Sequence, residues 1–320
     1  MATLSSLTRG APSTRRPSAR RPGRSPVRVE ALKVAVTGAG GRTGHQVCGE
    51  LLASSTDWTG VYRSQRGCKA VKKAADYAAK AGYEVDGSLE GCAVAVDALA
   101  DGAEEAYRAA FAGCDAVVLL TSAKPSLKKR SLALKLLTKV IPFVEETKIQ
   151  FRYSEYPEQV DWEGQKMAID AAAAAGVRRV VLVSSMGGTQ VDNFLNTMAG
   201  GNILLWKRKA EMYLQRSGVP EWCVVHPGGL VDTPAGEREL VVGVDDELLS
   251  TTSRSVSRQD LARVVVHCLT SPLASNTAFD LASKPEGEGE ASGDYEALLG
   301  SLGGRTCDYS LPAGSPVPLP

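Results

Sequence analysis

The sequence has no apolar run long enough to cross a bilayer. Its longest runs, such as 180–183 and 264–266, span only a few residues, whereas a membrane-spanning helix needs about 20. We therefore predict no integral membrane segment.

The chain also lacks any C-x-x-C pair, and its cysteines and histidines show none of the spacings of a zinc motif, so we predict no metal site. We interpret the cysteines as reduced core residues, with Cys68 and Cys307 as the more exposed candidates for a reactive thiol.

Acidic side chains are almost missing from the first 30 residues. This stretch contains seven arginines and one glutamate, is rich in Ser, Thr and Pro, and has no long apolar segment. Such a composition is typical of an organelle transit peptide, which we place at residues 1–31, and a disordered basic arm is the alternative. The whole chain has a net charge of +1, so the remainder carries −5. A mildly acidic body argues against nucleic acid as a partner.

A glycine-rich motif organises the rest of the chain. The apolar run 32–36 has the β-branched content of a buried parallel strand, and 45–53 has apolar residues at helical spacing. Between them stands Thr37-Gly38-Ala39-Gly40-Gly41-Arg42-Thr43-Gly44. A glycine loop that joins a strand to a helix is the context in which a G-x-x-G-x-x-G string predicts dinucleotide binding.

Each glycine of this loop has an expected role. Gly38 allows the tight turn, Gly41 lets a pyrophosphate approach the backbone, and Gly44 lets the helix pack closely on the strand. The N-terminus of the helix 45–53 would supply backbone N–H groups and partial positive charge to the phosphates, and we count Thr43 of the loop among the cofactor-binding residues. A turn in which the glycines serve only chain geometry is the alternative.

The end of the second expected strand, 57–62, indicates which nicotinamide cofactor is bound. An acid that accepts from the ribose 2′-OH is usual there when NAD is preferred, but this chain has Arg63. A guanidinium can bind the 2′-phosphate of NADP(H) at two points, with Arg42 as a possible helper, so we predict NADP(H). The alternative is that Arg63 and Arg42 are solvent-exposed surface residues that bind no phosphate. Asp97, at the end of the third strand, is placed to accept from the adenine amino group.

Strands that alternate with helical patterns predict an α/β, doubly wound parallel sheet with a small C-terminal lobe on the substrate side. Ligands of such sheets lie beyond the carboxyl ends of the strands, where we also place Thr121, Ser122 and Ala123. We expect strands at 32–36, 57–62, 92–96, 115–120, 179–183, 222–226, 240–244 and 278–281, and helices at 45–53, 69–80, 104–111, 160–175, 203–215 and 261–270.

Two stretches depart from this alternation. Residues 124–156 begin with a basic amphipathic segment and continue to an aromatic cluster, and we interpret them as a flap over the cofactor edge. The basic face is either solvated or a contact for lipid or an acidic partner. The aromatic residues are Phe143, Phe151, Tyr153 and Tyr156. The tail 284–320 is rich in Gly, Glu and Pro, and we expect it to be loosely ordered.

Several blocks within about 32–283 together resemble an atypical short-chain dehydrogenase/reductase with a Rossmann fold, in the NmrA-like group of plant NAD(P)-binding proteins. They are the glycine loop, Ser184-Ser185-Met186-Gly187-Gly188, the stretch Trp206-Lys207-Arg208-Lys209 and the turn Pro227-Gly228-Gly229. Tyr156-Pro157-Glu158-Gln159-Val160-Asp161-Trp162 adds to the likeness. Some members of that group are plastidic, so the resemblance implies the chloroplast, and we expect the stroma.

The resemblance also implies roles for individual residues. Ser185 stands at the position of the serine that binds the substrate carbonyl, and Lys207 at that of the lysine that binds the nicotinamide ribose. Pro227 and Gly228 belong to the cofactor-binding turn. The catalytic tyrosine of the family should precede the lysine by four residues, but Ile203 stands there and cannot donate a proton. Tyr153 or Tyr156 of the flap, or solvent, would have to supply it.

These observations favour an NADP(H)-dependent oxidoreductase that transfers hydride to or from a small or medium apolar substrate. The alternative, which the missing tyrosine favours, is a non-catalytic NADP(H)-binding redox sensor or photosynthetic assembly factor. Ser185 could equally be a strand-end serine bonded to backbone or water. His226 is a core residue or a pocket-lining residue, and we assign no role to His45 and His267.

Overall fold

The computed structural model describes residues 32–83, 89, 92–127, 151–309 and 317. The transit peptide predicted at residues 1–31 lies outside the described residues. So do Phe143 and every basic residue of the amphipathic segment except Lys124.

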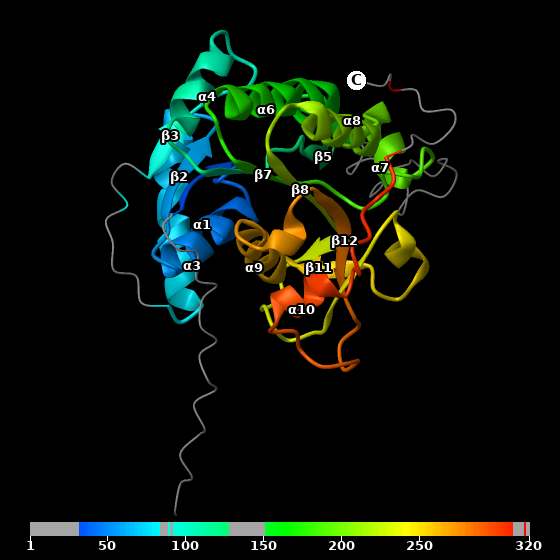
Figure 1. Ribbon diagram of the computed structural model, residues 1–320. Coiled ribbons are helices and arrows are strands. Elements are labelled where there is room, and N and C mark those ends of the chain that lie inside the picture. Colours follow the sequence, from blue (N-terminus) through cyan, green and yellow to red (C-terminus); the bar gives the residue numbers. More distant parts are fainter. Residues whose placement is uncertain (1–31, 84–88, 90–91, 128–150, 310–316, 318–320) are drawn as a thin grey trace, which may run out of the picture.

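A ten-stranded sheet runs through the molecule in the order β3-β2-β1-β4-β7-β8-β12-β11-β9, with β10 also paired to β12 (Figure 1). The seven strands from β3 to β12 are parallel, as predicted, and β10 and β11 pair with β12 antiparallel. The strands are β1 Lys33–Thr37, β2 Asp57–Tyr62, β3 Ala93–Ala95, β4 Ala116–Leu119, β7 Arg179–Val183, β8 Glu221–Pro227, β9 Gly229–Val231, β10 Leu240–Gly243, β11 Ser255–Ser257 and β12 Thr277–Ser283.

The central strands are buried on both faces because helices cover both sides of the sheet (Figure 1). Helices α1 Gly44–Ala53, α3 Lys72–Lys80 and α9 Arg258–Cys268 cover one face. Helices α4 Ala103–Phe111, α6 Gly164–Ala174 and α8 Ile203–Arg216 cover the other. This confirms the doubly wound α/β prediction. Among the described residues, no helix combines the length and the apolar character needed to cross a bilayer.

Short helical segments connect the larger elements. They are α2 Gln65–Cys68, α7 Phe194–Thr197, α10 Tyr295–Gly300, the 3₁₀ turns η1 Lys69–Val71, η3 Met198–Gly200, η4 Glu247–Ser250 and η5 Pro272–Ala274, and the π-helical segment η2 Glu158–Glu163. The η2 segment leads directly into α6 and packs against α8. It therefore links the base of the flap to the helix that carries Lys207.

The base of the expected flap is a two-stranded ribbon. Strands β5 Pro125–Leu127 and β6 Phe151–Tyr153 pair antiparallel, with Pro125 opposite Tyr153. Of the flap aromatics, Tyr153 is buried, Phe151 is half-buried and Tyr156 is exposed. The ribbon thus turns one tyrosine toward the body of the protein at the carboxyl edge of the sheet.

The C-terminal segment differs from the loosely ordered tail that its composition predicts. Helix α10 begins after Asp294, whose side chain caps it by accepting from the Ala297 N–H, and it buries Leu298 and Leu299. Farther along, the Cys307 N–H donates to the Ala278 carbonyl of β12 at 3.0 Å. Most of the Gly and Glu residues that suggested disorder lie before α10, whereas the leucines within and after it pack on the main core.

Candidate cofactor and substrate site

The glycine loop lies at the carboxyl end of β1, between β1 and α1. Gly38 has φ +66°, and a Cβ there would lie 3.0 Å from the carbonyl carbon and oxygen of Leu120, at the end of β4. A Cβ at Gly44 would overlap the Gly38 carbonyl oxygen, so only glycine lets α1 begin this close to the strand. Gly41 donates its N–H to the Gly38 carbonyl at 2.9 Å. The loop is therefore shaped by close backbone approach.

The N-terminus of α1 lacks a side-chain cap that would compete with a phosphate, although the His45 and Gln46 N–H groups donate to the Gly41 and Thr43 carbonyls. Thr43 stands at the N-cap but makes no side-chain cap hydrogen bond, and the first turn contains no acidic residue. Backbone N–H groups in such a first turn remain available to an anion. The arrangement of loop and helix can thus receive a pyrophosphate, as expected.

Arg63 and Asp97 lie together at the same sheet edge, after β2 and β3. Arg63 Nε is 3.5 Å from Asp97 Oδ2, and its Nη1 is 2.5 Å from Glu155 Oε1, which comes from the base of the flap. The Glu155 hydrogen bond is the main reason why the pKa of Arg63 is raised. The side chain is 59% exposed, so the guanidinium is held by acids but accessible to a phosphate.

Arg42 points to a different partner. Its Nη1 lies 3.2 Å from Asp232 Oδ2, and Asp232 also pairs with the buried Arg258 at 2.6 Å. Arg42 therefore forms an ion pair with the residue that follows β9, and its side chain stays 71% exposed.

The segment after β4 is fixed by η2 and α6. The Thr121 carbonyl accepts from Gln165 Nε2 at 2.8 Å, and the Ala123 N–H donates to Asp161 Oδ2 at 3.0 Å. Ser122 Oγ makes only a 3.4 Å contact with the neighbouring Ala123 carbonyl. Two of the three predicted positions are thus held by backbone hydrogen bonds, which leaves the Ser122 hydroxyl available at this edge.

Lys207 forms an ion pair that the sequence did not reveal. Its Nζ lies 2.8 Å from Oδ1 of Asp161, whose side chain is fully buried, while only 11% of the Lys207 side chain is exposed. Asp161 belongs to η2, and Lys207 to the second turn of α8. The pair fixes the ammonium close to Ala123, after the end of β4, because Asp161 also accepts from the Ala123 N–H.

Ile203 lies in an apolar cluster with Ala123, Leu204 and Tyr153. Tyr153 therefore packs against the residue that replaces the family's tyrosine. Burial, followed by the nearby Asp161 carboxylate, raises the pKa of Tyr153. Tyr156 is 56% exposed, and its ring centroid lies 6.2 Å from that of Tyr153. Of the two flap tyrosines, Tyr153 is the one placed next to Ile203.

Ser185 follows β7 and is half-buried, with its Oγ donating to the Met186 carbonyl at 3.0 Å. It lines a small pocket together with Thr189, Arg208 and His226. The adjacent Ser184 instead points inward and donates to the buried Glu211. The strand end thus directs one serine to the pocket and the other to the core.

The Pro227-Gly228 turn closes the same region. The Pro227 carbonyl accepts from the Met186 N–H at 3.2 Å, and the Gly228 N–H donates to the Leu281 carbonyl at 2.9 Å. A Cβ at Gly228 would lie 2.5 Å from the Arg254 carbonyl oxygen, so this position too requires glycine. The turn holds the ends of β7, β8 and β12 in register below the pocket.

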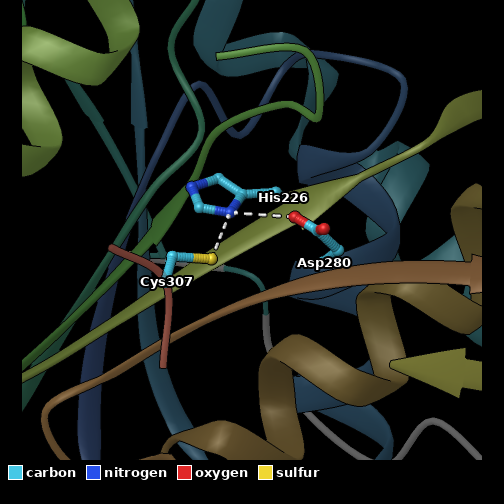
Figure 2. Close-up of side chains that lie close together, drawn as sticks. All are labelled: His226, Asp280 and Cys307. Atoms are coloured by element: carbon cyan, nitrogen blue, oxygen red, sulfur yellow. Dashed lines mark hydrogen bonds and ion pairs between the residues drawn. The ribbon is translucent and has the colours of Figure 1, made fainter. Parts of the chain in front are cut away.

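His226 lies at the centre of a buried polar cluster on β8 (Figure 2). Its Nε2 is 3.0 Å from Glu211 Oε2, and its Nδ1 is 3.3 Å from Asp280 Oδ1 and 3.6 Å from Cys307 Sγ. Burial alone would lower the pKa of His226, but Glu211, Asp280 and Cys307 together raise it well above its usual value. Burial alone would raise the pKa of Glu211, but His226 outweighs this and lowers it to about 2.

Sequence reasoning missed three members of this region: Asp161, Glu211 and Cys307. Asp161 stands within the quoted Tyr156–Trp162 block, which was a usable signal. Glu211 lies four residues after Lys207 and carries no motif of its own. Cys307 was expected to be more exposed than the other cysteines, but it is 5% exposed and lies against His226, because the C-terminal segment packs on β12.

Comparisons with known proteins agree with this geometry. A family model described as NAD(P)H-binding matches residues 38–272. The chain is 43% identical over 276 residues to an uncharacterized chloroplastic protein of Arabidopsis thaliana, which covers 85% of this chain and 75% of that protein. It is 44% identical over 205 residues to sanguinarine reductase of Eschscholzia californica, which covers 60% of this chain and 74% of the reductase.

The fold has a counterpart among solved structures. A putative NAD-dependent epimerase/dehydratase from Bacillus halodurans superimposes with a TM-score of 0.58 at 19% identity, covering 85% of this chain and 100% of the other. At that identity the match establishes the fold. The chloroplastic relative agrees with the chloroplast that the resemblance implies, whereas the composition of the first 31 residues predicts only an organelle.

Proposed function

Because this chain belongs to the NAD(P)H-binding family, we propose that it is an NADP(H)-dependent oxidoreductase that transfers a hydride between the nicotinamide and a small or medium apolar substrate. The observation that carries the proposal is the ion pair of Lys207 with the fully buried Asp161, at the sheet edge that also holds the glycine loop. The cofactor supplies the hydride, and the protein orients it and limits access of water.

Lys207 and Ser185 are the positioning groups in this proposal. The ammonium of Lys207, fixed by Asp161, would donate to the hydroxyls of the nicotinamide ribose. Ser185, at the pocket, would donate to a polar atom of the substrate. Both groups would orient the nicotinamide and the substrate at the reacting centre. Binding energy that is used there, in the transition state, raises the rate.

Arg63 carries the preference for NADP(H). Its exposed guanidinium follows β2 and would exchange its contacts with Asp97 and Glu155 for the 2′-phosphate. Arg63→Glu should weaken NADPH binding at least tenfold more than NADH binding, because a carboxylate repels the phosphate. Arg66→Glu, an exposed arginine three residues on, is the matched control and should change both affinities little. Equal losses for the two cofactors in Arg63→Glu would refute the preference.

Tyr153 is the side chain best placed to replace the missing proton donor. It packs on Ile203 and lies near Asp161, whereas Tyr156 is exposed. Tyr153→Phe should lower kcat by about 10²–10⁴-fold with unchanged NADPH affinity, and Tyr156→Phe should be near wild type. A Tyr153→Phe enzyme with full kcat would assign the proton to solvent instead.

Transfer of label from NADPH tests whether the protein is an enzyme at all. NADPH deuterated at one face of C4 should lose its label to a product on incubation with the protein and plastid extract. Sanguinarine is a defined second substrate to try, because a 44% identical relative is named for reducing it. Micromolar NADPH binding without transfer to any product would favour the alternative, a non-catalytic NADP(H)-binding sensor or assembly factor, which Ile203 supports.

We place this activity in the chloroplast stroma. The support is the basic leader at residues 1–31 and the chloroplastic relative. A fusion of residues 1–31 to a fluorescent protein should accumulate inside chloroplasts, in the soluble fraction after lysis. A cytosolic fusion would contradict the targeting, and a thylakoid-bound full-length protein would contradict the stroma.

A further inference from the structure

Three potential metal ligands from separate parts of the chain meet in the lining of the pocket that contains Ser185. His226 and Asp280 are register partners on the adjacent parallel strands β8 and β12, so their side chains leave the sheet side by side. Cys307 reaches them from the C-terminal segment (Figure 2). One ligand atom from each lies within 4.8 Å of the other two, and all three residues are buried.

The distances between these atoms suit a tetrahedral ion. Zinc binds nitrogen at about 2.0–2.1 Å, thiolate sulfur at about 2.3 Å and carboxylate oxygen at about 2.0–2.2 Å. Tetrahedral angles then require an N···S separation of about 3.6 Å and an N···O separation of about 3.4 Å. The observed separations from His226 Nδ1 are 3.6 Å to Cys307 Sγ and 3.3 Å to Asp280 Oδ1.

The groups around the three side chains are those that a metal site requires. The second ring nitrogen of His226 is held by Glu211, and a carboxylate there fixes the ring and directs the Nδ1 lone pair toward a metal. The Asp245 N–H donates to Cys307 Sγ at 3.4 Å, so the sulfur is held in place. Both carboxylate oxygens of Asp280 are buried, and neither makes a hydrogen bond of good geometry. That carboxylate is the least satisfied member of the cluster.

The local charge also balances with a divalent cation. Glu211, Asp280 and a Cys307 thiolate carry three negative charges, and the buried Arg208 carries one positive charge beside Glu211. A divalent ion brings the sum to zero. Binding would displace the thiol proton and any proton on Nδ1 to solvent. A ligand set of one thiolate, one imidazole and one carboxylate at tetrahedral spacing favours zinc over magnesium or calcium, which prefer oxygen alone.

We propose that His226 Nδ1, Asp280 and Cys307 Sγ form a zinc site, with a fourth position open to the pocket that Ser185 and Thr189 line. The three ligands themselves line this pocket, so the fourth position faces it. A site of three protein ligands with one open position is the arrangement of catalytic rather than structural zinc. The site does not depend on the cofactor assignment.

Cobalt substitution tests the site directly. The full chain, purified under reducing conditions and treated with a chelator, should bind about one Co²⁺ per chain and show a thiolate-to-cobalt absorption band in the near ultraviolet, which Zn²⁺ abolishes. Cys307→Ser should lose the band. Cys307→Ser and Asp280→Asn should each weaken Zn²⁺ binding by more than the 10–100-fold expected for the outer-shell change Glu211→Gln.

Cys114→Ser is the matched control, because Cys114 is a buried cysteine beside the Ala110 carbonyl, away from this cluster. Cys114→Ser should keep the thiolate-to-cobalt absorption band and the wild-type affinity for Zn²⁺. NADPH binding by each variant reports whether it is folded. Absence of a thiolate band in the wild-type protein, or an equal band in Cys307→Ser, would overturn the proposal and leave His226 as an imidazolium held between two carboxylates.

Discussion

Replacing Asp161 with asparagine should lower both the free energy of unfolding and the affinity for the cofactor. The change removes the charge that fixes Lys207 at 2.8 Å and keeps an oxygen that can still accept from the Ala123 N–H. The lysine is then left nearly buried without a counter-charge. Asp161→Asn should therefore weaken NADPH binding although Asp161 is not expected to touch the cofactor.

The magnitude follows from the geometry. Two unit charges 2.8 Å apart attract by about 6 kcal/mol at an effective dielectric constant of about 20, before the cost of removing both from water. Breaking a buried pair by removing one partner typically costs about 3–5 kcal/mol. We expect that loss for Asp161→Asn and a similar one for Lys207→Met. The double variant should lose about 2–3 kcal/mol less than the sum, because the two changes remove the same interaction.

Urea unfolding of the four proteins measures this coupling. The exposed i, i+4 pair of Glu104 and Arg108, at 3.1 Å, is the matched control, and its own double-mutant cycle should give less than about 1 kcal/mol. NADPH fluorescence titration of the same proteins reports the loss of cofactor binding. Additive effects of Asp161→Asn and Lys207→Met would refute the claim that this ion pair organises the site.

Two further predictions concern the loop and the sheet. Gly44→Ala places a Cβ against the Gly38 carbonyl and should cost about 1–3 kcal/mol with a marked loss of NADPH binding. Gly300→Ala should be tolerated, because its Cβ would make only an ordinary 3.8 Å contact with the Leu273 side chain, and equal effects of the two changes would contradict the packing argument. Burial acts to raise the pKa of Glu221, but hydrogen bonds from Arg179 and its neighbour outweigh this and lower it. This ion pair therefore stabilises the protein above pH 4.5, and its contribution is lost as the pH falls through the lowered pKa of Glu221. Glu221→Gln should cost about 1.5–3 kcal/mol of unfolding free energy at pH 7 and progressively less below pH 4.5, as measured by urea unfolding. A cost that does not change with pH would contradict this account.

The sheet and the glycine loop could be predicted because their signals are local. A β-branched run, a glycine loop and a helical apolar pattern follow one another within 32–53, and the same alternation repeats along the chain. Parallel strands then place Gly38, Arg63 and Asp97 on one edge, as the structure has them. Only the order of strands and the direction of crossovers were needed for this inference.

The polar partners could not be predicted because they depend on distant contacts. Asp161 meets Lys207 only because the π-helical segment packs on α8. The cluster of His226 with Cys307 requires the C-terminal segment to return along β12, although its Gly, Glu and Pro content suggested disorder. Arg42, a possible helper at the 2′-phosphate, forms an exposed ion pair with Asp232 that its place in the loop did not reveal.

A structure of the protein with bound NADP⁺ tests the central claim most directly. The account predicts the pyrophosphate at the backbone N–H groups of Arg42–Gly44, the 2′-phosphate on Arg63, and Lys207 Nζ within hydrogen-bond distance of the nicotinamide ribose while still paired with Asp161. The nicotinamide C4 should face the pocket of Ser185. A cofactor bound with its nicotinamide away from Lys207, or a 2′-phosphate that does not contact Arg63, would contradict it.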